Sequence, residues 1–508
     1  MKQKVVIIGS GIGGLATANL LAKAGYDVHV YEQHDAPGGR AGTLVKDGFT
    51  FDTGPSWYLM PEVFEHMYNL LGTSAAQELE VVRLQPSYKV FFEHDAPVTI
   101  NGNLSEARRL FDSIEPGAGR ALDQYAAISK LAYDMSLKHF LYTNTRSLGD
   151  MLDLEVLKHS PNLVRMVTTS FDSHVSRYFH DRRIKQILEY SMVFLGASPY
   201  KTPAIYSLMN ALDFELGVYY LKGGMYTLIE SLVRVGDTLG VRYHYNASVT
   251  RIITQNRVAV GVEIDGREEV KADIVISNAD LHFTETKLLA ASEQTYPQKY
   301  WDKRTAGPSA LLLYLGVSGS LPELEHHSLL FVDDWKGNFD AIYGTKTIPE
   351  SASLYVSRAT ASDPFMAPKG HESIVVLVPY PSGLSITSDD CEKLADRYIQ
   401  QLAEMAHIPD FAQRIVSRTV VGPDDFASNF NAWEYTALGP SHTLRQTAWF
   451  RMHNKSRRVK NLYYVGGSTI PGIGLPMCVI GAELIYKHLA GIKKGGPIDR
   501  IDQIGNSK

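Results

Sequence analysis

A glycine-rich turn near the start of the chain has the residue types and spacing that hold a diphosphate. Gly9, Gly11 and Gly14 form the pattern G-x-G-x-x-G, and Gly13 lies inside it. The first glycine permits a tight turn, the second lets a phosphate approach backbone N–H groups at a helix N-terminus, and the third lets helix and strand pack closely. We therefore predict that this turn binds the diphosphate of a dinucleotide, with an ordinary turn as the alternative.

Two features that follow this turn narrow the choice of dinucleotide. Glu32 ends the next apolar run, where a carboxylate can accept hydrogen bonds from a ribose hydroxyl and would repel the 2′-phosphate of NADP. The second glycine turn, Gly38-Gly39-Arg40, brings backbone and a permanent charge toward the same ligand. NAD-binding folds usually lack such a turn, so we predict FAD. An ordinary turn with a solvated arginine, which binds no ligand, is the alternative.

The segments around these motifs predict an α/β fold with a Rossmann-like domain. Apolar runs at 5–8 and 28–31 flank a helical pattern at 13–24, which is a βαβ unit. Similar α/β character returns at 222–280, and again where a buried strand at 461–465 precedes a helix near 479–489. We therefore expect a discontinuous FAD-binding domain, an inserted α+β substrate and membrane-associating domain, and a mobile tail. Their ranges are 1–75, 222–300 and 455–492 for the first, 76–221 and 301–454 for the second, and 493–508 for the tail.

The composition excludes several classes of partner. A net charge of −5 gives no global attraction for a polyanion, so we do not expect a nucleic-acid partner. Cys391 and Cys478 lie far apart without a CxxC spacing, which fits a reducing compartment. We see no metal-ligand cluster, and no apolar run approaches the ~20 residues that span a bilayer. The chain is therefore expected to be cytoplasmic, with only peripheral membrane contact.

Taken together, these motifs resemble the phytoene-desaturase-type carotenoid desaturases and isomerases, within the larger amine-oxidase-like flavoprotein superfamily. Further carriers are Phe49-Thr-Phe-Asp-Thr-Gly-Pro55, Lys222-Gly-Gly224, Ser277-Asn-Ala-Asp280, Gln446-Thr-Ala-Trp-Phe-Arg451, Asn461-Leu-Tyr-Tyr-Val-Gly-Gly467 and Pro471-Gly-Ile-Gly-Leu-Pro476. Besides Gly13 and Gly39, which complete the two turns, the resemblance places FAD contacts at Gly9, Gly11, Gly14, Glu32, Arg40, Gly54, Pro55, Val249, Gly467, Gly474 and Pro476. For Val249, a half-buried strand residue without a ligand is the alternative.

The resemblance also implies a reaction. A C–C single bond of a carotenoid, or of another long isoprenoid, would be dehydrogenated by hydride transfer to the flavin, with a quinone or oxygen as the final electron acceptor. Asp150 coincides with an acidic position of the family that could accept the remaining proton, although a plain helix-start role is the alternative. Carotenoid isomerisation, oxygenation or amine oxidation on the same scaffold remain alternatives. So does a flavin-free lipid carrier of the Rab GDP-dissociation-inhibitor type.

A helical pattern over 161–190 suggests how such a lipid could be reached. Leu163, Val167, Phe171, Val175 and Phe179 lie four apart, which predicts an apolar stripe along one helix. Basic residues follow at Arg182, Arg183 and Lys185. We consider two arrangements: the stripe rests on a membrane while the basic residues meet anionic head groups, or it packs into the core of the substrate domain.

Overall fold

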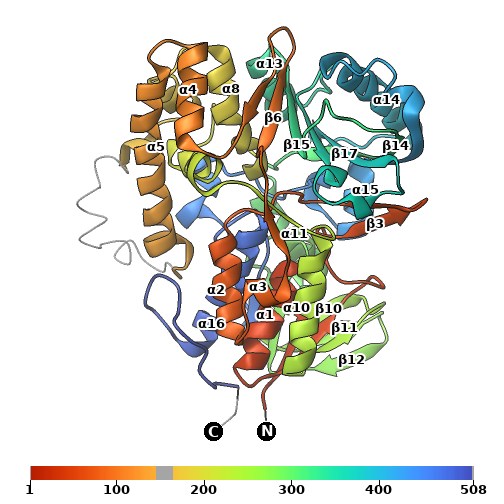
Figure 1. Ribbon diagram of the computed structural model, residues 1–508. Coiled ribbons are helices and arrows are strands. Elements are labelled where there is room, and N and C mark those ends of the chain that lie inside the picture. Colours follow the sequence, from red (N-terminus) through yellow and green to blue (C-terminus); the bar gives the residue numbers. More distant parts are fainter. Residues whose placement is uncertain (1, 145–163, 506–508) are drawn as a thin grey trace.

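Five short strands form a parallel sheet in the lower lobe of the computed structural model, which describes residues 2–144 and 164–505 (Figure 1). The strand order is β19 (Leu462–Tyr464), β13 (Ile274–Ser277), β1 (Lys4–Ile8), β2 (Asp27–Tyr31) and β9 (Arg242–His244). These strands come from three separate stretches of the chain. Except for the edge strand β9, they are nearly continuous runs of buried residues, because a parallel sheet is covered on both faces.

Helices complete the predicted βαβ unit. α1 (Ile12–Lys23) joins β1 to β2 and packs against α10 (Tyr226–Leu239), α16 (Leu475–Ala490) and α2 (Pro61–Leu71). Small residues such as Ala16 let α1 approach its neighbours closely, and ten of its residues are buried. The predicted Rossmann-like α/β fold is therefore confirmed. Beside this sheet lies an antiparallel sheet of β10 (Val249–Gln255), β11 (Val258–Ile264) and β12 (Glu268–Lys271).

The upper lobe is built on a mixed sheet of seven strands. Their order is β18 (Ile415–Val421), β14 (Ser309–Ser318), β17 (His371–Tyr380), β16 (Leu354–Arg358), β15 (His327–Phe331), β6 (Tyr88–Phe92) and β7 (Val98–Ile100). Successive side chains of β14 point to opposite faces of the sheet. Leu311 and Leu313 therefore pack with α14 (Ser388–Met405), whereas Leu312 packs with Phe49 and Phe51. The antiparallel pair β3 (Thr43–Lys46) and β4 (Phe49–Asp52) thus connects the two lobes.

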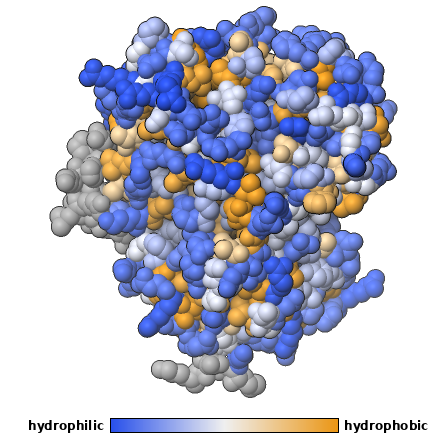
Figure 2. Space-filling model, in the orientation of Figure 1, coloured by the Kyte–Doolittle hydropathy of each residue, from blue (hydrophilic) through white to orange (hydrophobic). Residues whose placement is uncertain are grey.

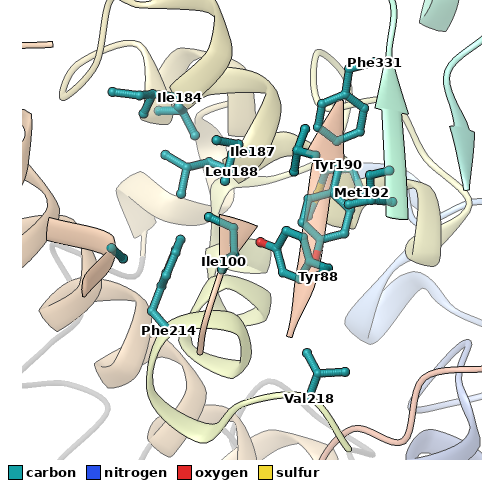
Figure 3. Packing of buried hydrophobic residues seen from close by; sticks show 14 of the residues in the cluster. Tyr88, Ile100, Ile184, Ile187, Leu188, Tyr190, Met192, Phe214, Val218 and Phe331 are labelled. Atoms are coloured by element: carbon teal, nitrogen blue, oxygen red, sulfur yellow. The ribbon is translucent and has the colours of Figure 1, made fainter. Parts of the chain in front are cut away.

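Helices cover the β6 end of this sheet and enclose a large apolar core (Figure 3). They are α4 (Leu104–Ile114), α5 (Ala118–Met135), α7 (Phe171–Val175) and α8 (Arg182–Glu189). In Figure 3 Ile187 and Leu188 of α8 lie in the same cluster as Tyr88 of β6 and Tyr190. Further short α-helices and strands are α3 (Ala75–Glu78), β5 (Val81–Arg83), α9 (Leu208–Ala211), β8 (Tyr219–Leu221), α11 (Leu281–Lys287), α12 (Gln298–Trp301), α13 (Trp335–Asp340) and α15 (Pro423–Phe430).

The single helix predicted over 161–190 is wrong in its described part. Residues 164–168 are helical, but Ser170 then caps α7 by accepting a hydrogen bond from the backbone N–H of Ser173, and Asp181 caps α8. These capping side chains start new helices in new directions. Phe171, Val175 and Phe179 are fully buried in the upper core, so this stretch faces the protein interior. Leu163 lies outside the described residues.

The basic residues that follow the stripe are also committed within the protein. Arg182 forms an ion pair with Asp95 at 2.6 Å and a second one with Asp333. Lys185 pairs with Asp172 at 3.0 Å. Their charges are therefore balanced by these carboxylates, and we no longer propose that they bind anionic lipid head groups.

The C-terminal segment differs from the mobile tail that its composition predicts. Through residue 505 it packs against the parallel-sheet lobe, where Ile498, Ile501 and Ile504 contact the core around α1 and α16. The backbone N–H groups of Ile504 and Gly505 donate to the carbonyl of Ala24 at 2.9 and 3.0 Å. The isoleucines three residues apart give this segment an apolar side, which the lack of helical or strand periodicity concealed.

Candidate flavin site

The predicted diphosphate turn lies at the carboxyl edge of the parallel sheet. β1 runs into Gly9, β13 into Asn278 and β19 into Gly466, so three chain segments meet at one place. Ligands of open α/β sheets bind in this crevice, outside the carboxyl ends of the strands. In the sequence, Asn278 belongs to the motif Ser277-Asn-Ala-Asp280, and we did not predict it as a site residue. Its signal was available, because it is a polar residue directly after a buried strand.

Steric limits and backbone conformation explain the glycines of this turn. A Cβ atom at Gly14 would lie 2.2 Å from the carbonyl oxygen of Gly9, and one at Gly13 would lie 2.7 Å from Oδ1 of Asn278. Gly9 has a φ of +91°, which other residues rarely adopt. Helix α1 begins after Gly11 with no side-chain cap and no acidic residue in its first turn. Its N-terminal N–H groups are thus available to an anion.

Glu32 stands beside this turn, as predicted. Its Oε2 accepts hydrogen bonds from the backbone N–H and the hydroxyl of Ser10, both at 2.8 Å, and its Oε1 accepts one from the N–H of His34 at 3.0 Å. The carboxylate is therefore rigidly oriented. Val249 is buried in the same apolar cluster as Tyr31, and the N–H of Ala247 donates to the carbonyl of Glu32. The two predicted contacts thus lie on adjoining segments.

The second glycine turn rests on the first. The N–H of Gly38 donates to the carbonyl of Ser10, and a Cβ at Gly39 would lie 3.4 Å from the Cα of Gly11. Arg40 donates from Nη2 to the carbonyl of Thr436 at 3.3 Å, and its guanidinium lies 5.8 Å from the ring centroid of Phe430. Its buried Nε has no partner among the described residues. A buried donor without an acceptor is costly, so the turn offers an N–H to a ligand.

The segment around Gly54 and Pro55 packs directly on Arg40. A Cβ at Gly54 would lie 1.9 Å from the carbonyl oxygen of Arg40, so only glycine allows this contact. Just before it, Oδ1 of Asp52 accepts a hydrogen bond from the N–H of Met225 at 2.7 Å. Asp52 therefore ties this segment to the loop at Gly224. Burial raises the pKa of Asp52 to about 7.

Gly467, Gly474 and Pro476 lie on a turn between β19 and α16. Gly474 has a φ of +119° and precedes α16, whose first turn contains Pro476 and which has no side-chain cap. Arg451 donates to the carbonyls of Gly467 and Thr469 and so supports this turn. Burial raises the pKa of the Cys478 thiol to about 12. A thiol that stays protonated is a poor nucleophile, so we expect the flavin to be held noncovalently.

Two other expectations concern catalysis and metals. Asp150 lies outside the described residues. Glu93, His94 and Asp333 bring three ligand atoms within 4.8 Å of one another at the surface. However, Arg182 already forms an ion pair with Asp333, and this pair supplies the positive charge that a cation would bring.

The described residues fit the ADP half of FAD. The two glycine turns form a cradle in which a Cβ at Gly11, Gly13, Gly14 or Gly38 would clash with neighbouring atoms. The uncapped start of α1 and the free Nε of Arg40 offer N–H donors, and Glu32 offers a carboxylate. At Glu32 the site suits a neutral ribose hydroxyl and not a 2′-phosphate, because the carboxylate would repel the phosphate.

Comparison with known proteins agrees with this geometry. Residues 12–483 match the family described as flavin containing amine oxidoreductase. Among solved structures, a putrescine oxidase with bound putrescine superposes with a TM-score of 0.60 at 16% identity, over 97% of this chain and 98% of that one. An oxidoreductase from Methanosarcina mazei gives a TM-score of 0.59 at 18% identity, over 95% and 100%. The chain belongs to the flavin containing amine oxidoreductases and is an FAD-dependent oxidoreductase.

Curated relatives define the group more closely. The chain is 39% identical to a carotenoid 3,4-desaturase of Haloarcula japonica, over 95% of this chain and 97% of the relative. It is 37% identical to a zeta-carotene-forming phytoene desaturase of Myxococcus xanthus, over 96% and 94%. The resemblance to the phytoene-desaturase-type carotenoid desaturases is therefore confirmed, and the chain belongs to that group.

Proposed function

We propose that this chain is an FAD-dependent desaturase that introduces C=C bonds into a carotenoid or a similar long apolar isoprenoid. The observation that carries the proposal is the near-complete coverage of relatives named for carotenoid desaturation, on a chain whose two glycine turns and Glu32 form an FAD cradle. We assign the cradle residues to the contacts predicted above. We also assign the ranges 1–75, 222–300 and 455–492 to the FAD-binding domain, and 76–221 and 301–454 to the substrate domain.

The bound FAD would accept a hydride from a C–H bond next to the polyene, which leaves a delocalised cation and one proton to be removed. An unsubstituted hydrocarbon offers the protein no group to activate. The chain must therefore orient the substrate and exclude water. Asp150 remains our proposed acceptor of the proton. The aromatic core of the upper lobe, which includes Trp57, Tyr88 and Phe331, provides an apolar environment beside the connection between the lobes.

We further propose that the protein meets its substrate as a peripheral protein on a membrane surface. Among the described residues, no helix combines the length and apolar character needed to cross a bilayer. Exposed apolar side chains occur at Val164 (61% exposed), Val167 (42%), Leu444 (43%) and Phe450 (60%). Their segments are linked, because Met166 packs against Ala204 and the nearby Tyr206 hydroxyl lies 2.6 Å from Nδ1 of His442.

A run of cations lies close to Phe450 in the sequence. Lys455, Arg457, Arg458 and Lys460 follow Phe450 closely, are exposed, and form no ion pair within the described ranges. Basic residues beside apolar ones favour binding to an anionic leaflet. The face drawn in Figure 2 has apolar and hydrophilic side chains intermixed. A membrane quinone or oxygen would then remove the electrons from the reduced flavin.

The experiment supplies liposomes loaded with phytoene or a related carotenoid precursor, without NADPH, and follows the product by absorbance and mass. Desaturation removes two hydrogens per new double bond and shifts the absorption to longer wavelength. A product of unchanged mass would indicate isomerisation, and a gain of oxygen would indicate oxygenation. Strict dependence on NADPH, equal turnover of a soluble amine without liposomes, or purified protein without yellow flavin would each contradict the proposal.

The membrane face has its own test. Replacing Leu444 and Phe450 by serine should reduce co-flotation with anionic liposomes and desaturation of liposomal substrate, while flavin content stays unchanged. Val45→Ser with Val416→Ser is the matched control, since these valines are 68% and 57% exposed on β3 and β18. Equal flotation of both variants and the natural protein would place membrane contact elsewhere.

A further inference from the structure

Arg451 is a buried cation that has no negatively charged partner among the described residues. Only 1% of its surface is exposed. Its guanidinium donates to backbone carbonyls: to Thr469 at 3.2 Å, to Pro440 at 3.4 and 3.5 Å, to Gln446 at 3.5 Å, and to Gly467. Within residues 2–144 and 164–505, no carboxylate forms an ion pair with it. Arg358 differs, because it lies 3.2 Å from Glu372.

The charge on Arg451 persists at neutral pH. Burial lowers the pKa of Arg451 to about 10, which is still well above 7. The same surroundings keep the neighbouring side chains neutral: burial and the charge of Arg451 lower the pKa of His442, and burial raises the pKa of Tyr206. The carbonyl dipoles offset part of the cost of burying a cation, but an unpaired buried charge still costs several kcal/mol. A negative ligand nearby would complete the balance.

The position of Arg451 indicates which ligand this is. It lies behind the turn from Gly467 to Gly474, and a Cβ at Gly472 would come 3.7 Å from its Nε. The same turn leads into the uncapped N-terminus of α16, where the helix dipole adds positive potential. The positive charges of Arg40 and Arg451 both counteract the rise that burial causes in the pKa of the Cys478 thiol, in the first turn of α16. The carboxyl group of Asp280 interacts electrostatically with Arg40 and favours its positive charge. Among the described residues, no carboxyl group does the same for Arg451.

We infer that Arg451 makes this flavin site selective for the negatively charged, reduced form of FAD over the neutral, oxidised form. The inference rests on the flavin contacts proposed at Gly467 and Gly474. Uptake of a hydride brings two electrons and one proton from the substrate C–H bond to the flavin, so the flavin gains one negative charge. The substrate carbon loses the same pair of electrons, and the neighbouring carbon then releases a proton, whose C–H bonding pair forms the new C=C bond. Arg451 is thus a positioning and charge-supplying residue that favours hydride acceptance.

The test is the two-electron reduction potential of the bound FAD, measured against reference dyes. The natural protein should bind reduced FAD more tightly than oxidised FAD, which raises the potential above that of free FAD. Arg451→Met should lower the ratio of the two affinities by at least about tenfold, or ~30 mV for two electrons. Arg451→Lys keeps the charge and should keep most of the ratio. Arg358→Met, which removes an arginine that has a carboxylate partner, should leave it unchanged.

The outcomes separate this inference from the proposed contacts. If Arg451→Met does not fold, the natural protein and Arg451→Lys still test the inference. It is overturned if the bound FAD of the natural protein has a reduction potential at or below that of free FAD. It is also overturned if Arg451→Lys loses the whole preference for reduced FAD. If Glu32 and Arg40 variants bind FAD normally, the proposed contacts at the ADP half fail instead, and the potential remains measurable. Bound flavin with an unchanged potential in Arg451→Met overturns only the role of Arg451.

Discussion

Gly54 is the residue at which one added methyl group should affect the flavin site most. A Cβ there would lie 1.9 Å from the carbonyl oxygen of Arg40, so Gly54→Ala must push the second glycine turn aside. Overpacking of this kind costs about 1–3 kcal/mol, and we expect weaker FAD binding and a lower unfolding temperature. Gly344→Ala is the control, because no neighbouring atom lies within 4 Å of its Cβ. Equal effects of the two variants on flavin fluorescence titrations would refute the close contact.

Glu32 and Arg40 test the site by charge. Glu32→Ala removes the acceptor that orients Ser10, and Arg40→Ala removes a buried donor. Hydrogen bonds to charged groups contribute roughly 1.5–3 kcal/mol, so each variant should lower FAD affinity about 10- to 150-fold. Glu263→Ala is the control, since it removes only contacts outside the flavin site, namely an ion pair with Arg251 and a hydrogen bond from the Thr250 hydroxyl. Unchanged flavin occupancy in both site variants would show that these residues do not hold FAD.

At the scale of elements, the C-terminal segment stabilises the parallel-sheet lobe. Ile498, Ile501 and Ile504 are half-buried against it, and Lys487 of α16 donates to the carbonyl of Gly496. Full burial of such a side chain contributes about 1.5–3 kcal/mol. The triple substitution of these isoleucines by serine should therefore lower the unfolding temperature clearly. Serine at Val45, Phe365 and Val416, which are exposed, should not. Calorimetry that finds no difference between the two triple variants would contradict this role.

For the whole molecule, a buried carboxyl makes global stability depend on pH. Glu189 ends α8 and accepts a hydrogen bond from Nε1 of Trp335 at 2.8 Å. Burial, aided by the negative charge of Asp172, raises the pKa of Glu189 to about 8. A raised pKa in the folded state means that this group's stabilising contribution is full below its unfolded pKa near 4.5 and is lost as pH rises toward 8.

Glu189→Gln removes this titration. Its free energy of unfolding relative to the natural protein should therefore rise between pH 5 and pH 8, in urea unfolding at fixed ionic strength. Glu263→Gln, on the surface, should show no such rise, because an Arg251 ion pair lowers the pKa of Glu263 instead. Parallel pH profiles of Glu189→Gln and the natural protein would mean that Glu189 is ionised in the folded state.

The sequence by itself determined the two glycine turns, which we propose hold the cofactor, and the class of protein. Gly9 to Arg40 are contiguous, and the roles of these glycines follow from local backbone conformation and from strand–turn–helix order, which a short stretch of sequence contains. The predicted strands and helix of this unit agree with β1, α1 and β2 within one or two residues. The position of a glycine therefore predicts a turn before any tertiary contact is known.

Only the tertiary structure decided which surfaces the other residues face. The stripe of Phe171, Val175 and Phe179 has the same spacing whether it meets lipid or core, and packing against α5 and β6 settled that it is core. The hydrogen bond from Arg40 to Thr436 and the one from Met225 to Asp52 join segments that lie far apart along the chain. Periodicity specifies an apolar side of an element, but its partner is chosen by the fold as a whole.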